Sequence, residues 1–151
     1  MADEKDAGPI LGIIDQYTKD LSFENINSLS SMGPNMEQPE IDIQMKVSAT
    51  NAEKEDNYRV SLSTKIKTVS KGKTLFVLEL DYCGEFLIKG FDKTLMDPLL
   101  NIECPRLLFP YARSIISSTV SEGGFPPLHL APVNFADLYQ QQLAAQNQTK
   151  Q

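Results

Sequence analysis

Apolar and polar residues alternate one by one along three stretches of the chain, at residues 41–48, 58–67 and 75–82. A period of two places every second side chain on the same face of a sheet, so each stretch is predicted to form a strand with one buried face. The apolar positions are Ile41, Ile43, Met45 and Val47, then Tyr58, Val60, Leu62 and Ile66, and finally Phe76, Leu78, Leu80 and Tyr82. The links between these strands are short, which predicts antiparallel neighbours.

Another strand is predicted from Ile13 to Glu24. Its odd-numbered positions include Ile13, Tyr17, Leu21 and Phe23, whereas its even-numbered positions after Ile14 are polar. The segment that follows, Asn25 to Pro39, is rich in Ser, Asn, Gly and Pro, and these residues oppose regular structure. Connections of this length are usually functional or mobile, so this crossover is a candidate functional segment.

In the second half of the chain the apolar residues recur at helical spacing. A short helical piece is expected at Leu95 to Leu100, and a longer helix at Leu107 to Val120 is expected to end at Gly123-Gly124. Asn134 and Asp137 resemble a capping box that opens a final helix. Strands followed by helices predict an α+β fold, with a four-stranded antiparallel sheet and helices packed on one face.

Composition favours a soluble binding protein in a reducing compartment. The chain has 151 residues, enough for one domain with its own core, and its formal net charge of −6 without a Lys/Arg cluster argues against nucleic-acid binding. Met1 to Pro9 lacks the basic start and apolar run of a signal peptide, and no apolar run approaches the ~20 residues of a membrane span. With only two cysteines and no disulfide framework, we expect a cytoplasmic protein.

We expect the chain to divide into a flexible N-terminus at residues 1–9, a single domain at residues 10–145 and a polar, flexible tail at residues 146–151. Within the domain, some apolar residues exceed the needs of one small core. Leu75 and Val77 are predicted to point away from the apolar face of their strand, and Met32 and Met36 stand in the polar crossover. We interpret these four side chains together as parts of association surfaces.

No set of residues points to catalysis. His129 is the only histidine, and it lies in a proline-rich segment rather than beside a candidate nucleophile. Cys83 and Cys104 are expected to be buried small apolar residues, and one histidine with two cysteines is too few for a structural zinc site. No phosphate-binding glycine motif is present. We therefore expect a protein that is not an enzyme and that uses no cofactor or metal.

Two segments carry a distinctive pattern of prolines and aromatic residues. Cys104 to Arg113 reads CPRLLFPYAR, and Phe125 to Phe135 reads FPPLHLAPVNF. Both closely resemble the signature stretches of SecB, the bacterial protein-export chaperone family, and Tyr17 to Glu24 is similar to the first strand of that family. The three segments occur in the family's order, and the resemblance extends over about residues 10–143.

The resemblance implies an ATP-independent holdase that binds unfolded precursor proteins in the cytoplasm, keeps them translocation-competent and delivers them to the export motor SecA. It also implies a homotetramer built as a dimer of dimers, with no binding to nucleic acid and no direct membrane insertion. By the family's pattern, the motor contacts are Asp20, Glu24, Val77 and Glu79. The client contacts are Met32, Met36, Ile41, Ile43, Met45, Tyr139 and Leu143. The tetramer interface includes Tyr111, Ile115 and Ser118.

Strand parity agrees with part of this assignment, because Asp20 and Glu24 share one face of their strand, as do Val77 and Glu79 of theirs. The apolar client contacts stay ambiguous, because the same alternation marks residues that face the monomer's own core. Two other functions also stay open. One is a SecB-like chaperone dedicated to an antitoxin or another single client, and the other is an unrelated small enzyme on an α+β scaffold.

Overall fold

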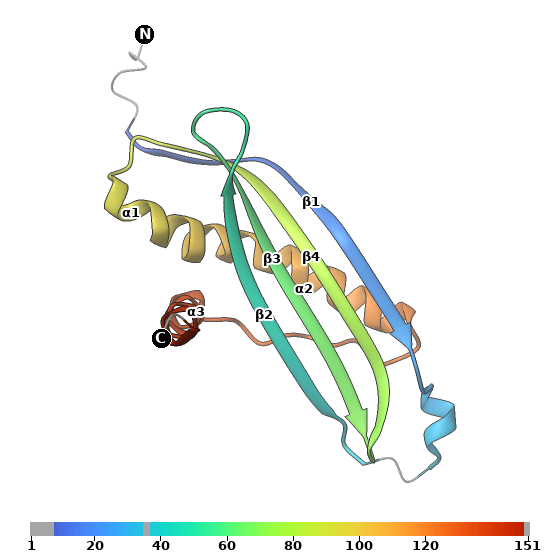
Figure 1. The fold of residues 1–151 in the computed structure, drawn as a ribbon. Helices are drawn as coiled ribbons and strands as arrows, with labels where there is room; N and C mark the ends of the chain where they lie inside the picture. The colour runs from blue at the N-terminus through green and yellow to red at the C-terminus, as the bar shows by residue number, and fades with distance from the viewer. Residues whose placement is uncertain (1–7, 35–36, 150–151) are drawn as a thin grey trace.

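The computed structural model describes residues 8–34 and 37–149. Within these residues, four strands form one antiparallel sheet in the order β1-β4-β3-β2 (Figure 1). The strands are β1 (Ile10–Asn25), β2 (Glu40–Asn51), β3 (Asn57–Ser70) and β4 (Lys73–Lys89). The crossover after β1 carries the chain to the opposite side of the sheet, so β1 and β2 form its two outer edges.

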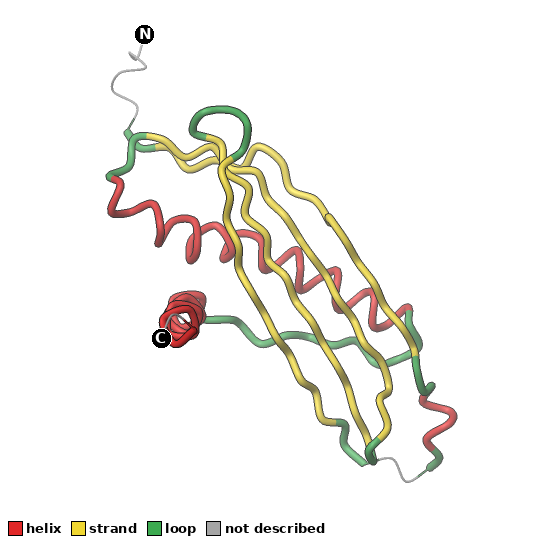
Figure 2. The backbone as a smooth tube through the Cα atoms, in the orientation of Figure 1, coloured by secondary structure: helices red, strands yellow, loops and turns green. Residues whose placement is uncertain are grey.

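The helices lie on one face of this sheet (Figures 1 and 2). Helix α1 (Lys93–Pro98), a π-helical turn η3 (Leu99–Glu103) and α2 (Cys104–Glu122) follow one another without a break, and α3 (Phe135–Thr149) lies beside β2. The predicted α+β class, with helices on one face, is confirmed. A short 3-10 helix, η2 (Leu29–Met32), forms in the crossover, where no regular structure was predicted.

The sequence indicates correctly where α2 ends and where α3 begins. Helix α2 begins at Cys104, before the predicted Leu107. Helix α2 ends before the predicted glycine pair, where Gly124 adopts a φ of 96°. Helix α3 begins after Asn134, whose side-chain oxygen accepts the backbone N–H of Asp137 at 3.1 Å. It continues to Thr149, past residue 146 where the polar tail was expected to start, because Ala and Gln favour a helix and no Gly or Pro interrupts it.

The core lies between the sheet and α2. Alternate residues of β3 and β4 are buried, and α2 meets them with residues three or four positions apart. The main members are Val60, Leu62, Ile66, Leu78, Leu80, Phe86, Leu108, Ala112, Ile116 and Val120. Gly84 of β4 permits this close packing, because a β-carbon there would lie 2.6 Å from the Phe86 ring and 2.8 Å from Leu108.

The predicted faces of β1 are partly wrong, because the strand contains two register shifts. The shifts lie between Ile13 and Asp15 and between Thr18 and Asp20. A bulge of this kind adds one residue to a strand, so the side chains beyond it point to the opposite faces from those that simple alternation predicts. Tyr17 therefore pairs with Cys83 and lies on the face without helices. The prediction that Tyr17 shares a face with Leu21 and Phe23, which pair with Leu80 and Leu78, is wrong.

Leu75 also departs from its predicted position. A register shift between Thr68 and Val69 of β3 leaves Leu75 without a ladder partner, and its side chain is only 2% exposed. The Leu75 carbonyl accepts the backbone N–H groups of Ile26 and Asn27 at 2.8 and 3.1 Å. The residue thus anchors the start of the crossover to β4 and does not extend an outward-facing association surface.

Candidate functional site

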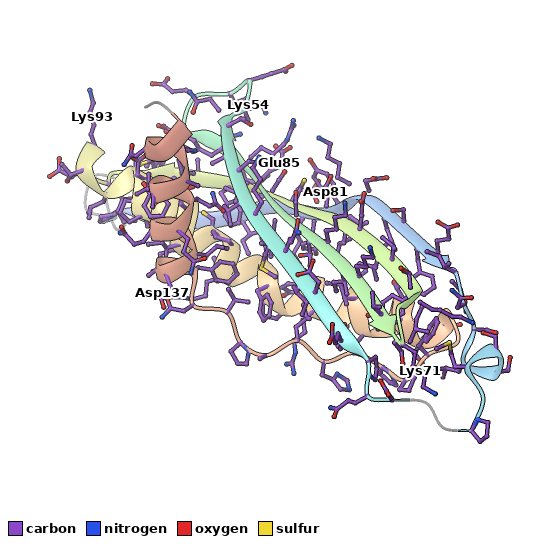
Figure 3. The ribbon with its side chains drawn as sticks, turned by 60° about the horizontal axis from the view of Figure 1, so that its bottom comes forward. Lys54, Lys71, Asp81, Glu85, Lys93 and Asp137 are labelled. Carbon is purple, nitrogen blue, oxygen red and sulfur yellow. The ribbon has the colours of Figure 1, made fainter. Side chains whose placement is uncertain are left out.

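The face of the sheet that carries no helix has acidic and basic side chains on different central strands. Acidic side chains come from β1 and β4 and basic side chains come from β3, whereas β2 adds one of each, Asp42 and Lys46. The acidic set is Asp15, Asp20, Glu24, Glu79, Asp81 and Glu85, and the basic set is Arg59, Lys65 and Lys67. Asp81 and Glu85 project from this face, on the side away from α2 (Figure 3). We call this surface the open face.

The four predicted motor contacts lie together on the open face. Glu24 is the register partner of Val77, and Glu79 is the partner of Ser22, midway between Glu24 and Asp20. The structure adds Asp81, which lies directly opposite Asp20. Asp81 has the same strand parity as Glu79, so its face could have been predicted, but its pairing with Asp20 depends on the bulges of β1.

Ion pairs neutralise only part of the open face. Lys65 Nζ lies 3.6 Å from Glu79 Oε1, and Arg59 contacts Glu85 at 2.8 Å. The Tyr17 hydroxyl donates to Glu85 at 3.3 Å, and burial is the main cause that raises the pKa of Tyr17. Among residues 8–34 and 37–149, no basic side chain pairs with Asp20, Glu24 or Asp81, so these carboxylates are available to a partner.

An apolar hollow of about 250 Å³ lies on the other face, where η2 and the segment after α2 meet the sheet. Its lining consists of Leu29, Pro39, Ile41, Thr68, Leu75, Phe76, Val120, Phe125, Pro126, Pro127 and Leu128. Phe76 and Phe125 pack with their ring centroids 4.8 Å apart. Of the predicted client contacts that the structure describes, only Ile41 lines this hollow, because the other walls come from segments distant in sequence. We call it the β2 hollow.

A second hollow, of about 440 Å³, lies between the far part of β2 and α3. Tyr139 and Leu143 line it together with Val47 and Ala49. Burial raises the pKa of Tyr139, and the nearby Asp97 carboxylate raises it further. The structure thus separates Tyr139 and Leu143 from Ile41 by about 20 Å of strand, at roughly 3.3 Å per residue from Ile41 to Val47.

The Gln142 side chain covers the edge of β2 at this second hollow. The Val47 backbone N–H donates to Gln142 Oε1 at 3.0 Å, and Gln142 Nε2 donates to the Val47 carbonyl at 3.3 Å. These two bonds reproduce those that a neighbouring strand would make. Because backbone groups alternate in direction along a strand, Met45, Ile43 and Ile41 also present their amide groups at this outer edge.

The structure shows which apolar residues of β2 are buried in the chain and which are exposed. Val47 is 5% exposed and belongs to the core, whereas Ile41 and Ile43 are 44% and 43% exposed on the helix-bearing face. Met45 is half-buried. Met32 is also half-buried and packs against the core, and Met36 lies outside the described residues. An exposed apolar strip with an open backbone edge therefore lies between the two hollows.

The predicted tetramer contacts lie along one side of α2, because Tyr111, Ile115 and Ser118 are spaced by four and three residues. Tyr111 is 49% exposed, and its ring stacks on Tyr82 with centroids 6.2 Å apart. Ile115 is half-buried and Ser118 is exposed. This side of α2 offers apolar and small side chains to a neighbour.

The thiols and the histidine show no catalytic arrangement. Cys83 and Cys104 are both 0% exposed, as predicted, and burial raises the pKa of Cys104 to about 12. His129 Nδ1 lies 3.4 Å from Ser117 Oγ, but no hydrogen bond within the described ranges joins the ring to a carboxylate. No group of three or more His, Cys, Asp or Glu side chains in that part of the chain is placed to hold a metal ion.

Comparison with known proteins identifies the family. A family model described as preprotein translocase subunit SecB matches residues 4–146. The chain belongs to the SecB family. It is 49% identical over 145 residues to the protein-export protein SecB of Rhodopseudomonas palustris strain TIE-1, covering 96% of this chain and 92% of that protein. The Afipia carboxidovorans protein-export protein SecB is 47% identical over 148 residues, covering 98% and 91% of the two chains.

SecB membership makes this chain a protein-export chaperone, as the resemblance of its signature segments predicted. The fold agrees with a solved SecB-like structure, the Mycobacterium tuberculosis Rv1957 chaperone in complex with a ChAD peptide from the Rv1956 HigA1 antitoxin. The TM-score is 0.68 over 82% of this chain and 90% of that one, at 12% sequence identity. None of the described helices is long and apolar enough to cross a membrane.

Proposed function

We propose that this SecB-family chain is an ATP-independent cytoplasmic holdase, without enzymatic activity, that keeps unfolded precursor proteins competent for translocation and delivers them to SecA. The observation that carries the proposal is the exposed apolar strip of Ile41 and Ile43 beside the open edge of β2. An unfolded segment can bury its apolar side chains there and add its backbone to the sheet as a further strand. Both interactions tolerate varied client sequences.

Client binding is expected to use the β2 hollow, the exposed strip and the hollow beside α3 in succession. Complete burial of one large apolar side chain contributes roughly 1.5–3 kcal/mol, so each position by itself binds weakly. The three positions follow one strand, which lets a single extended client segment occupy them together. Met32 lies in the crossover, at the end of η2, and Tyr139 and Leu143 form the wall at the other end.

SecA is expected to dock on the open face, at Asp20, Glu24, Val77 and Glu79. The unpaired carboxylates of Asp20 and Glu24 provide charge, and half-buried Val77 provides an apolar contact between them and β3. This face and the client strip lie on opposite sides of the sheet, so motor and client can bind at the same time. Charge reversal by Asp20→Lys is therefore expected to weaken SecA binding and to spare client binding.

The proposed assembly is a homotetramer, a dimer of dimers, in which α2 packs against a partner through Tyr111, Ile115 and Ser118. Several client grooves on one particle would raise avidity through effective concentration. Light scattering should report a mass well above the 16.8 kDa of one chain. The Tyr111→Glu variant should shift that mass downward, whereas Lys93→Glu on α1 should leave it unchanged.

The test of the whole proposal uses one precursor protein in unfolded form and the same protein fully folded. The chaperone should bind the unfolded form and delay its folding without nucleotide. Preference for the folded form would end the holdase proposal. A chaperone dedicated to one antitoxin or other single client is the alternative, and it predicts that unrelated unfolded precursors do not compete for binding.

A further inference from the structure

Two hydroxyl groups lie buried without a hydrogen-bond partner on the helix-facing side of β3. Thr64 and Thr68 are 2% and 3% exposed, and neither Oγ1 atom has a donor or acceptor within the described structure. On the same face, Leu62 precedes Thr64 and Ile66 lies between the two threonines, and both are apolar as expected in a core. A buried hydroxyl without a partner is unfavourable, and so its presence calls for an explanation.

The two threonines differ in what they face. Thr68 lines the β2 hollow, whereas Thr64, four residues earlier on the same face, does not. Thr68 sits in the middle of the wall that the sheet contributes, between its register partners Ile41 and Phe76. All the other side chains that line the hollow are apolar. The hollow therefore presents a single hydrogen-bonding side chain within an aromatic, aliphatic and proline lining.

We propose that Thr68 makes the β2 hollow selective for a tyrosine side chain of the unfolded client, with the tyrosine hydroxyl bonded to the Thr68 hydroxyl. The inference rests on the proposed client-binding function and adds a specificity-determining residue to it. In the free chain the Thr68 hydroxyl oxygen is buried. Rotation by about 120° about the Cα–Cβ bond moves this hydroxyl into the position that the methyl group holds and moves the methyl group into that of the Cβ hydrogen, so the hydroxyl can be turned toward an occupant without a change in the backbone.

Tyrosine fits because the occupant needs an apolar body and one uncharged polar atom at its far end. Its ring matches the lining of Phe76, Phe125 and Pro126, and its hydroxyl lies at the tip that reaches the sheet. Phenylalanine leaves Thr68 unpaired, and a charged side chain loses its hydration in an apolar site. At about 250 Å³, the hollow lies below the roughly 300–1,000 Å³ of small-molecule pockets, which suits one side chain.

The test measures the affinity of the full-length protein for two short unfolded peptides that differ only in one tyrosine or phenylalanine. The wild type, Thr68→Val and Thr64→Val are compared. Valine keeps the shape of threonine and removes only a hydroxyl that the free protein leaves unpaired, so both variants should fold. Thr64→Val is the matched control, because it makes the same change at an equally buried position outside the hollow.

In the wild type the tyrosine peptide should bind more tightly than the phenylalanine peptide, and Thr68→Val should reduce this preference roughly three- to tenfold. Thr64→Val should leave the preference unchanged, and Thr68→Ser should retain it. Equal effects of Thr68→Val on both peptides, or no preference in the wild type, would overturn the inference while leaving the holdase proposal intact. If neither the peptides nor an unfolded precursor bind, the client-binding proposal itself fails.

Discussion

The carboxylates of Asp20 and Asp81 belong to residues that lie directly opposite each other on β1 and β4. Like charges on directly opposite residues destabilise a sheet. No basic side chain of the described residues pairs with the carboxylate of Asp20 or of Asp81. Lys65, on the neighbouring strand, pairs with Glu79 at 3.6 Å. We interpret the unmatched pair as part of a surface that meets a cationic partner.

Removing one charge of this pair should increase the stability of the chain and weaken its binding to SecA. Asp20→Asn or Asp81→Asn should raise the free energy of unfolding by about 0.2–1 kcal/mol, because the repulsion across the strands is relieved. SecA binding at low salt should weaken roughly two- to fivefold. Chemical denaturation and titration with SecA measure the two effects. Asp42→Asn, on β2 of the same face, is the control, and equal weakening in that variant would show that general surface charge is responsible.

Removing the Gln142 side chain should expose the edge of β2. Gln142→Ala loses two hydrogen bonds to Val47, so the free energy of unfolding should fall by about 1–2 kcal/mol. Hydrogen exchange at the Val47 amide should become faster. Gln141→Ala, at an exposed position of the same helix, should change neither quantity. Unchanged exchange at Val47 in the Gln142 variant would contradict the role of this side chain as an edge cover.

Gly84 should not accept even a methyl group. Gly84→Ala places a β-carbon 2.6 Å from the Phe86 ring and 2.8 Å from Leu108, so the contact between β4 and α2 must loosen. Overpacking of this kind should lower the free energy of unfolding by about 1–3 kcal/mol, measured by denaturant titration. Gly12→Ala in β1 is the matched control, since nothing lies within 4 Å of its β-carbon. Similar losses in both variants would refute the packing argument.

Burial of Cys104 predicts a loss of stability in alkaline solution. Desolvation, with a smaller effect of Glu103, raises the pKa of Cys104 from 9.0 to about 12. The folded chain therefore holds this proton more tightly than the unfolded chain. Its contribution is complete below pH 9.0 and is lost as the pH rises toward 12. Urea midpoints across this range should fall less steeply for Cys104→Ala than for the wild type.

Cys83→Ala is the control for the loss of side-chain volume in Cys104→Ala, because it removes an equally buried thiol from the sheet. A pH dependence that is identical in Cys104→Ala and the wild type would mean that other groups cause the alkaline loss. Alkylation by iodoacetamide offers an independent measurement, because only a thiolate reacts readily. Cys104 should be modified at the rate at which the chain unfolds.

Much of the local structure could be predicted from residue order. Strict alternation from residue 41 onward predicted β2, β3 and β4, since a two-residue period has only one regular interpretation. Gly123-Gly124 and Asn134 marked the end of one helix and the start of the next, because helix termini need specific backbone conformations and side-chain acceptors. The segments at Cys104 and Phe125 led to the SecB family, which the comparisons confirmed.

The bulges of β1 and the unpaired Leu75 could not be predicted in the same way. A bulge is stabilised by pairing with a partner strand and leaves no fixed pattern in the bulged strand itself. As a result, the face of Tyr17 and the pairing of Asp20 with Asp81 became known only from the β1–β4 register.

By itself, then, the sequence determined the family, the fold class, and that Asp20 shares a face with Glu24 and Val77 with Glu79, because each depends on local order or on parity within one strand. Only the tertiary structure decided which apolar residues of β2 are core and which are exposed. It also decided that Leu29, Phe76 and Phe125 surround Thr68. These contacts join segments that are far apart in the chain. They depend on how the crossover, α2 and α3 pack against the sheet, and the spacing of residues along the chain does not determine that packing.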